Sequence, residues 1–440
     1  MEFCDDFGHH FIIKGRDVSE HARSYLSGLV GSPRRKNIGG IGEDVAESNY
    51  QAMQQLITDS RWDDRALMDQ VAQGANDLLG GEHNSALYLD ETSFVKKGEA
   101  SVGVQRQYCG RLGKIENCQV GVFGCLGLED RAVLIDYRLF LPEAWAEDAE
   151  RCAKAKVPVE KRLHRTKPEL SLEIVREARE RGLQFAWVGG DEVYGNNREL
   201  TDALETMGET FVMDVSSNLH VYEADPRAEA KPARPAQAGP AKKSQTGDQK
   251  PRARTVEALV KERFASESRT ITVRETTKGT MRVRIWVQEI WQWEGKAAEP
   301  RPRLLVVRRE KDGTFKYSLS NASAKTSWER LGFMQAQRFW IERAFQDAKS
   351  ELGMAEYEVR GWRAWHHHMA LVCLAMYFVV RERVFAADHT PLLSARDVVE
   401  LLTHYLPRRN RTEEEVLASI RARHKQRERD IKRYQKPVTK

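Results

Sequence analysis

The order of strand-like and helix-like segments between residues 85 and 215 constrains this chain more than any other feature. Four stretches rich in apolar and β-branched residues come first, at positions 86–90, 102–109, 118–126 and 132–141. An amphipathic helix at 170–181, a strand at 184–189, a helix at 199–206 and a strand at 210–215 are expected to follow. Strands that begin as a group and then alternate with helices are typical of a mixed sheet with helices on its faces. The sequence therefore predicts an α/β fold.

Helical patterns dominate both ends of the chain. Apolar residues recur at helical spacing over 44–57 and 63–79, and again over 335–352, 365–384, 394–406 and 412–434. Four more strands are expected near 269–274, 281–290, 304–309 and 315–319. Residues 226–254 hold five of the chain's 14 prolines and almost no large apolar side chain, so they cannot bury a core and are predicted to be a disordered linker.

The net charge of +5 is unevenly distributed along the 440 residues. Residues 408–440 hold 12 Lys or Arg against 5 Asp or Glu, and residues 226–254 hold 8 against 2. Two basic segments on a slightly acidic body are typical of a protein that binds a polyanion, although solvated tails account for the charge equally well.

Composition excludes several classes of protein. The longest apolar run, 369–380, has 12 residues, whereas a membrane-spanning helix needs roughly 20. The first residues lack the basic and apolar regions of a signal peptide, so a cytosolic location is expected. Cys109, Cys118 and Cys125 form no CxxC pair and are interpreted as small buried residues rather than zinc ligands.

Two aspartates and one glutamate form a candidate metal site. Asp90 and Asp191 each follow an apolar strand, where ligands of such sheets gather, and Glu342 lies inside the long helix predicted at 335–352. Carboxylates from these three positions can hold two divalent cations for phosphoryl transfer. Capping aspartates and a surface glutamate are the alternative interpretation.

The long helix presents a more specific pattern around Glu342. Arg338 lies four residues before it and Lys349 seven residues after it, so all three side chains project from one face. Such a face can place the carboxylate on a metal and both cations on neighbouring phosphates. A solvated ion pair remains the alternative.

Four stretches, in this order, together resemble a known family. They are YLDETSFVKKG (88–98) with SVGVQRQY (101–108), GKIENCQVGVF (113–123), FAWVGGDEVYG (185–195), and a last block from 341 to 368 with IE, KSELG, YEVR, W and WHHH. The chain resembles the DDE transposases of bacterial insertion sequences, most closely the insertion-sequence 701 family of RNase H-like endonucleases.

The resemblance implies that Asp90, Asp191 and Glu342 are the catalytic metal ligands, with two Mg²⁺ ions for which Mn²⁺ can substitute. Arg338, Glu342 and Lys349 match the family's Tyr-x2-Arg-x3-Glu-x6-Lys signature, but Gln335 stands at the Tyr position, so that residue's role on the flanking strand does not carry over. The implied activity is cleavage at transposon ends followed by strand transfer, with double-stranded DNA as partner and a homodimer in the synaptic complex.

The resemblance also divides the chain. Residues 83–220 and 331–390 are expected to form the RNase H-like core, interrupted by a β-rich insertion at 221–330 that accounts for the 151-residue interval from Asp191 to Glu342. The helical region 1–82 is expected to bind DNA ends, and 391–440 is expected to be a basic helical region.

Further DNA contacts are predicted around the first acid and in the insertion. Lys96, Lys97 and Arg106 can contact phosphates, or can simply belong to a solvated hairpin. Trp291 can stack on an extruded base, although packing in a core explains it more simply. A related metal-dependent nuclease without strand transfer, and a domesticated DNA-binding protein, remain alternative functions.

Overall fold

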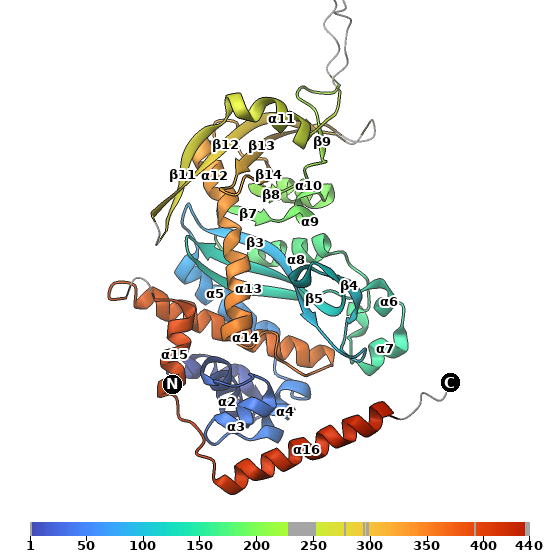
Figure 1. Cartoon of the computed structure of the whole chain (residues 1–440), viewed down its shortest axis with the longest axis vertical. Helices are drawn as coiled ribbons and strands as arrows, with labels where there is room; N and C mark the ends of the chain where they lie inside the picture. Colours follow the sequence, from blue (N-terminus) through green and yellow to red (C-terminus); the bar gives the residue numbers. More distant parts are fainter. Residues whose placement is uncertain are drawn as a thin grey trace, which may run out of the picture.

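The computed structural model describes residues 2–227, 252–276, 279–293, 295, 299–390 and 393–435. Most of the linker predicted at 226–254 lies outside these residues. Within them, a ten-stranded mixed sheet runs through the molecule with helices on both faces, as an RNase H-like fold requires (Figure 1). Among the helices in these ranges, none is long and apolar enough to span a lipid bilayer.

One side of the sheet is built from the strands predicted between residues 85 and 215. They are β3 (Ala86–Val95), β4 (Gln105–Cys109), β5 (Lys114–Leu128), β6 (Arg131–Leu139), β7 (Trp187–Gly190) and β8 (Phe211–Asp214). β5 pairs antiparallel with β3, β4 and β6, whereas β3, β7 and β8 run parallel to one another. The parallel strands therefore end at a common edge of the sheet.

Helices cover the two faces of this sheet, and alternate residues of β5 show which helix covers which face. The ring of Phe123 contacts Phe345 of α13 (Phe339–Glu351), with the ring centroids 5.4 Å apart. On the next residue, Gly124, a Cβ would meet Ile174 of α8 (Lys167–Glu180) at 2.5 Å. Since successive side chains of a strand point to opposite faces, α13 and α8 lie on opposite sides of the sheet.

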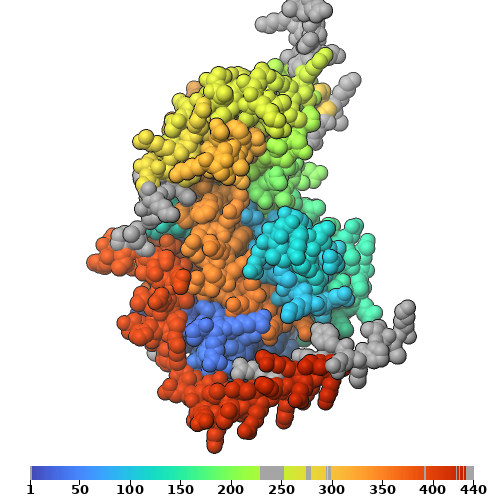
Figure 2. All heavy atoms as spheres, viewed as in Figure 1, coloured from blue at the N-terminus to red at the C-terminus, as the bar shows by residue number. Residues whose placement is uncertain are grey.

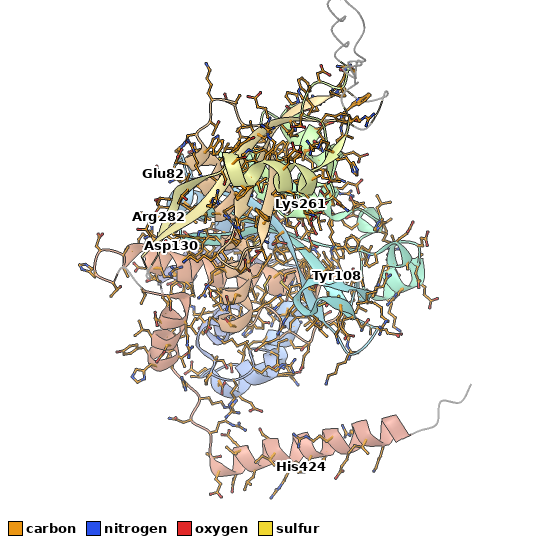
Figure 3. The ribbon with its side chains drawn as sticks, turned by 45° about the horizontal axis from the view of Figure 1, so that its top comes forward. Glu82, Tyr108, Asp130, Lys261, Arg282 and His424 are labelled. Atoms are coloured by element: carbon orange, nitrogen blue, oxygen red, sulfur yellow. The ribbon has the colours of Figure 1, made fainter. Side chains whose placement is uncertain are left out.

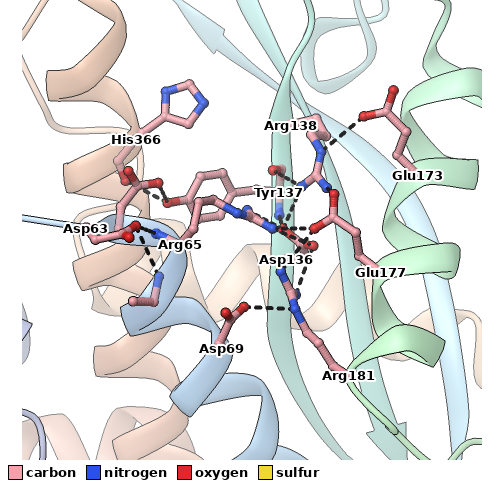
Figure 4. A network of polar contacts seen from close by, with 12 residues as sticks. Asp63, Arg65, Asp69, Asp136, Tyr137, Arg138, Glu173, Glu177, Arg181 and His366 are labelled. Carbon is pink, nitrogen blue, oxygen red and sulfur yellow. Dashed lines mark hydrogen bonds and ion pairs between the residues drawn. The ribbon is translucent and has the colours of Figure 1, made fainter.

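A polar network fastens β6 to α5 (Asp64–Leu79) and α8 (Figure 4). Asp136 is 1% exposed and accepts hydrogen bonds from Arg65 at 2.7 Å, Arg138 at 2.7 Å and Arg181 at 3.2 Å. Burial disfavours this carboxylate, but the three guanidinium groups outweigh that cost and hold the pKa of Asp136 below its usual range. These ion pairs, referred to below as the Asp136 network, therefore hold β6 against α5 and α8.

The terminal helices, apart from the last one in the chain, are joined to the sheet by one hydrophobic core. Buried side chains of the N-terminal helices pack against the apolar helix α14 (Trp362–Phe385), which carries the 12-residue apolar run. The helices at the two ends are α1 (Glu2–Asp6), α2 (Ser19–Gly31), α3 (Ile38–Asp44), α4 (Tyr50–Thr58), α15 (Ala395–Tyr405) and α16 (Glu413–Gln435). Figure 1 shows α16 extending along the end of the molecule farthest from the insertion.

The region predicted to be an insertion enlarges the same sheet. Its strands are β11 (Arg269–Thr276), β12 (Gly279–Gln292), β13 (Arg301–Arg309) and β14 (Phe315–Ser320), and β14 pairs antiparallel with β8. A helix that the sequence analysis did not predict, α11 (Val256–Glu267), packs on these strands through Leu259 and Phe264. Short elements complete the chain: β1 (Ile12–Ile13), β2 (Arg16–Asp17), α6 (Glu143–Ala146), α7 (Ala149–Lys154), α9 (Glu192–Gly195), α10 (Arg198–Thr206), β9 (His220–Val221) and β10 (Arg254–Thr255).

Two predictions made from the sequence have clear outcomes in this fold. Cys109, Cys118 and Cys125 are buried and unbridged, which confirms their interpretation as small core residues. The helix predicted as continuous over 335–352 is divided into α12 (Trp328–Gln337) and α13, with Arg338 between them. The predicted helix is therefore interrupted at one residue, although the backbone of Arg338 keeps right-handed helical angles, with φ −54° and ψ −27°.

Candidate active site

Asp90 is the first residue of β3 after its pairing with the parallel strand β7 ends. β7 pairs with β3 only from Ala86 to Leu89, and Leu89 is in register with Gly190, the last residue of β7. Asp90 and Asp191 are therefore the next residues on two adjacent strands, which in a sheet lie about 4.8 Å apart. The Asp90 side chain is buried, and its Oδ1 accepts a hydrogen bond from the backbone N–H of Glu91 at 2.7 Å.

Asp191 is held by the short helix that follows β7. It is the N-cap residue of α9, and its Oδ1 accepts the backbone N–H of Val193 at 2.9 Å. At the end of α9, Gly195 approaches the end of β8 so closely that a Cβ there would lie 1.9 Å from the backbone oxygen of Asp214. A glycine is needed at this contact, and it fixes the turn that presents Asp191.

A third carboxylate completes a compact acidic cluster. Each of Asp90, Glu91 and Asp191 offers a carboxylate oxygen, and these oxygens all lie within 4.8 Å of one another. Glu91 is anchored by Lys167 at 2.6 Å and by the Tyr194 hydroxyl, which donates to it at 2.8 Å. Glu91 was not predicted from the sequence as a site residue, because strand alternation places it on the face opposite to Asp90.

Arg338 connects this cluster to the helix that carries Glu342. Its guanidinium lies 3.5 Å from Asp90 Oδ2, 3.1 Å from Asp214 Oδ2 and 2.7 Å from Glu342 Oε1. Asp214 was also missed, although it is the last residue of β8, the strand that pairs with β7. Three adjacent parallel strands thus each place an aspartate at the same edge of the sheet.

The Glu342 carboxylate is separated from the aspartates by the guanidinium of Arg338, which forms ion pairs with both Asp90 and Glu342. The Glu342 side chain is 51% exposed and projects from α13, which crosses the sheet face that carries Asp90. Glu342 is not among the three residues whose oxygens lie within 4.8 Å of one another. The structure therefore brings Asp90 and Asp191 together as predicted, and Glu342 is linked to Asp90 through Arg338.

Lys349 is the second cation that α13 brings to the site. Its Nζ donates a hydrogen bond to the hydroxyl of Thr92, two residues beyond Asp90 on β3. Burial, and then the nearby charge of Arg111, lower the pKa of Lys349 to about 8. Arg338, Glu342 and Lys349 therefore lie along one side of the helix, as their spacing predicts.

Burial and mutual repulsion shape the electrostatics of the acids. Burial raises the pKa of Asp90 well above its usual range, and the Asp191 carboxylate raises it further. Burial and the Glu91 carboxylate raise the pKa of Asp191 to about 6, while Arg338 acts in the opposite direction on both aspartates. A divalent cation would relieve this repulsion, and clustered carboxylate oxygens are the ligands that Mg²⁺ and Mn²⁺ prefer. The donor set therefore fits a divalent metal.

The other residues predicted to contact DNA have different surroundings. Lys97 and Arg106 are exposed. Lys96 lies over the ring of Tyr357 with its Nζ 3.4 Å from the ring centroid, and burial with the charge of Arg35 lowers its pKa to about 7. Trp291 is half-buried on β12, where its backbone pairs with Tyr222.

Gln335, which replaces the signature tyrosine, is buried against the insertion. It is 5% exposed, and its Nε2 donates to Ser318 Oγ at 2.8 Å and to the backbone oxygen of Val306 at 3.2 Å. This side chain therefore supports the junction between α12 and the enlarged sheet.

A mixed sheet with acids at the ends of its parallel strands, faced by a helix with a further glutamate, is the arrangement of an RNase H-like nuclease. A sequence model of the DDE superfamily endonucleases matches residues 6–280, and the chain belongs to this family. The matched region includes Asp90 and Asp191 and ends before α13. A probable transposase for insertion sequence element IS701 from Microchaete diplosiphon is 26% identical over 232 residues, which are 52% of this chain. The chain spans 57% of that relative's length.

Proposed function

We propose that this protein is a DNA transposase that cleaves DNA at the ends of a mobile element and joins the freed ends to target DNA. The observation that carries the proposal is the cluster of Asp90, Glu91 and Asp191, whose oxygens lie within 4.8 Å of one another beside α13. Family membership makes DNA the substrate of this site, and the likeness to the IS701 transposase favours transposition over simple cleavage.

In the proposed reaction, Asp90, Asp191 and Glu342 are the catalytic residues and metal ligands. Two Mg²⁺ ions, or Mn²⁺ in their place, would supply Lewis-acid stabilisation of the attacking and leaving oxygens. Water attacks a phosphodiester at the element end, breaks the bond to the 3′ oxygen and leaves a 3′-hydroxyl. That hydroxyl then attacks a target phosphodiester, so one P–O bond forms as another breaks.

The chain's own cations would position the phosphates. Arg338 neutralises Asp90 and Asp214 in the metal-free protein, and its guanidinium is suited to a bidentate contact with a phosphate. Lys349 lies beside Thr92, where it can hold the neighbouring phosphate as a point charge. Lys96, Lys97, Arg106 and Trp291 are further proposed DNA contacts.

The wider assembly is part of the same proposal. Joining two element ends to one target calls for two active sites, so we propose a homodimer in the synaptic complex. The N-terminal helices and the basic helix α16 are proposed to bind the ends, with an affinity that falls steeply as salt rises. We place the protein in the bacterial cytosol, at the nucleoid while it is bound to DNA.

The test uses the DNA that flanks this reading frame. Terminal inverted repeats are expected there, and a duplex that carries one repeat should be cleaved with Mg²⁺ and joined to a target plasmid. Glu342→Gln should abolish both products, while Glu329→Gln, which changes a 56% exposed glutamate on α12, should retain them. Cleavage without joined product would favour the nuclease alternative, and full cleavage by Glu342→Gln would refute the catalytic assignment.

A further inference from the structure

The hairpin formed by β4 and β5 exposes apolar side chains beside the candidate active site. Tyr108 and Ile115 face each other across the two strands and are 62% and 61% exposed. Leu112, in the single 3-10 turn Gly110–Leu112 at the tip, is 44% exposed. Gly113 closes this turn with a φ of +62°, a conformation that favours glycine. A projecting tip with three exposed apolar side chains needs a functional explanation.

The same hairpin is basic. Arg106, Arg111 and Lys114 lie within it against one acid, Glu116, which is 3.5 Å from Lys114. Within the described residues, neither Arg106 nor Arg111 has an acidic group within ion-pairing distance. Exposed apolar residues flanked by unpaired cations match a polyanion that also offers apolar surface, and DNA has both in its phosphates and its stacked bases.

The hairpin lies on the same face of the sheet as the candidate active site, where DNA would bind. Tyr108 and Ile115 lie on the sheet face that carries Asp90 and α13, because Ile115 and Phe123, the partner of Asp90, are an even number of residues apart on β5. Arg111 is close enough to Lys349 for its charge to act on that ammonium group. Figure 2 shows the hairpin as a bulge next to α13, and Figure 3 shows Tyr108 at its surface.

We propose that this hairpin is a wedge that inserts Tyr108, Ile115 and Leu112 into DNA next to the scissile bond and unstacks base pairs there. Arg106, Arg111 and Lys114 hold the phosphates on either side. Apolar side chains inserted at a base step are a known means of opening and kinking a duplex, and exposed bases stack on aromatic rings. The inference rests on the proposed function, because it takes DNA as the substrate.

The experiment compares two 30-base-pair probes with the full-length protein and Ca²⁺, chosen to occupy the metal site without supporting cleavage. One probe is fully paired, and the other has the same sequence with three mismatched pairs at one end. A wedge does not have to unstack the open end, so the wild type should bind the mismatched probe about tenfold more tightly, and permanganate should oxidise end thymines of the bound paired probe.

Variants assign that preference to the hairpin. Tyr108→Ala combined with Ile115→Ala should bind both probes equally and leave the thymines protected, while Tyr108→Phe should behave as wild type. Tyr405→Ala removes a tyrosine that is 76% exposed on α15 and should also behave as wild type. Because the truncated side chains are exposed, the melting temperature of the double variant should not change.

The outcomes separate this inference from the proposed function. A wild type that binds neither probe contradicts both. A wild type that binds both probes equally, or a double variant that keeps the preference for the mismatched probe, contradicts the wedge alone. A double variant that keeps the preference but loses self-association would instead make the hairpin a contact between two copies of the chain.

Discussion

Removal of Arg338 should destabilise the metal-free protein, and divalent metal should restore much of the lost stability. The guanidinium is 17% exposed and faces Asp90 and Asp214, which are 12% and 19% exposed. Removal of one partner from a buried ion pair costs about 3–5 kcal/mol, because the remaining charge stays buried. Since these groups keep some contact with solvent, we expect the low end, about 3 kcal/mol.

Glu342, the third ion-pair partner of Arg338, adds little to this loss of stability. Glu342 is 51% exposed and forms an i,i+4 pair with Arg338, which is worth at most ~0.5 kcal/mol after solvent screening. At roughly 2 °C per kcal/mol in a large chain, Arg338→Ala should lower the melting temperature in EDTA by about 6 °C. Metal at a hundred times its dissociation constant adds about 2.7 kcal/mol, so saturating Mg²⁺ should nearly offset the loss.

Differential scanning calorimetry of both proteins, in EDTA and across a Mg²⁺ titration, measures these shifts. Arg343→Ala is the matched control, because Arg343 lies on the same helix, is 41% exposed and pairs with Asp347 at 3.0 Å. Its melting temperature should fall by about 1 °C and should respond to Mg²⁺ as the wild type does. If Arg338→Ala melts with the wild type in EDTA, or if saturating Mg²⁺ leaves its melting temperature unchanged, the guanidinium does not neutralise this cluster.

Three further predictions follow from the same contacts. In EDTA, the raised pKa of Asp191, about 6, should give a contribution to stability that is complete below about pH 4 and is lost, by up to about 3 kcal/mol, as pH rises through 6. Mg²⁺ should flatten this contribution, and urea melts at each pH will show whether it does. Asp136→Asn leaves three arginines around a neutral side chain and should lower the free energy of unfolding in urea by about 3 kcal/mol or more. A change within error of zero would contradict a stabilising role for the Asp136 network. Gly195→Ala should displace the turn that holds Asp191 and abolish DNA cleavage, whereas Gly98→Ala, with open space around its Cβ, should retain it.

The local part of the fold was predictable because it depends on short-range patterns. Helix α5 begins and ends within one residue of its prediction, since Asp63 caps it and its apolar residues recur at helical spacing. The strands of the core and of the insertion also lie where alternation and β-branched residues indicated them. Helix α11 was missed because it directly follows the Pro- and Lys/Arg-rich segment, whose composition obscured its start.

The residues of the candidate site were likewise only partly predictable from the sequence. By itself, the sequence determined that Asp90 and Asp191 each follow a run of apolar residues and that Arg338, Glu342 and Lys349 share a helix face, because these statements depend only on residue spacing. Only the tertiary structure decided which strands are neighbours, and therefore that Asp214 and Glu91 join the site and that β14 extends the sheet from β8. Strand pairing brings together residues that are far apart in the chain, and no local sequence pattern indicates which strand will be the neighbour of another. The ion pairs of Arg338 have the same origin, since the carboxylates that the guanidinium bridges come from three different elements.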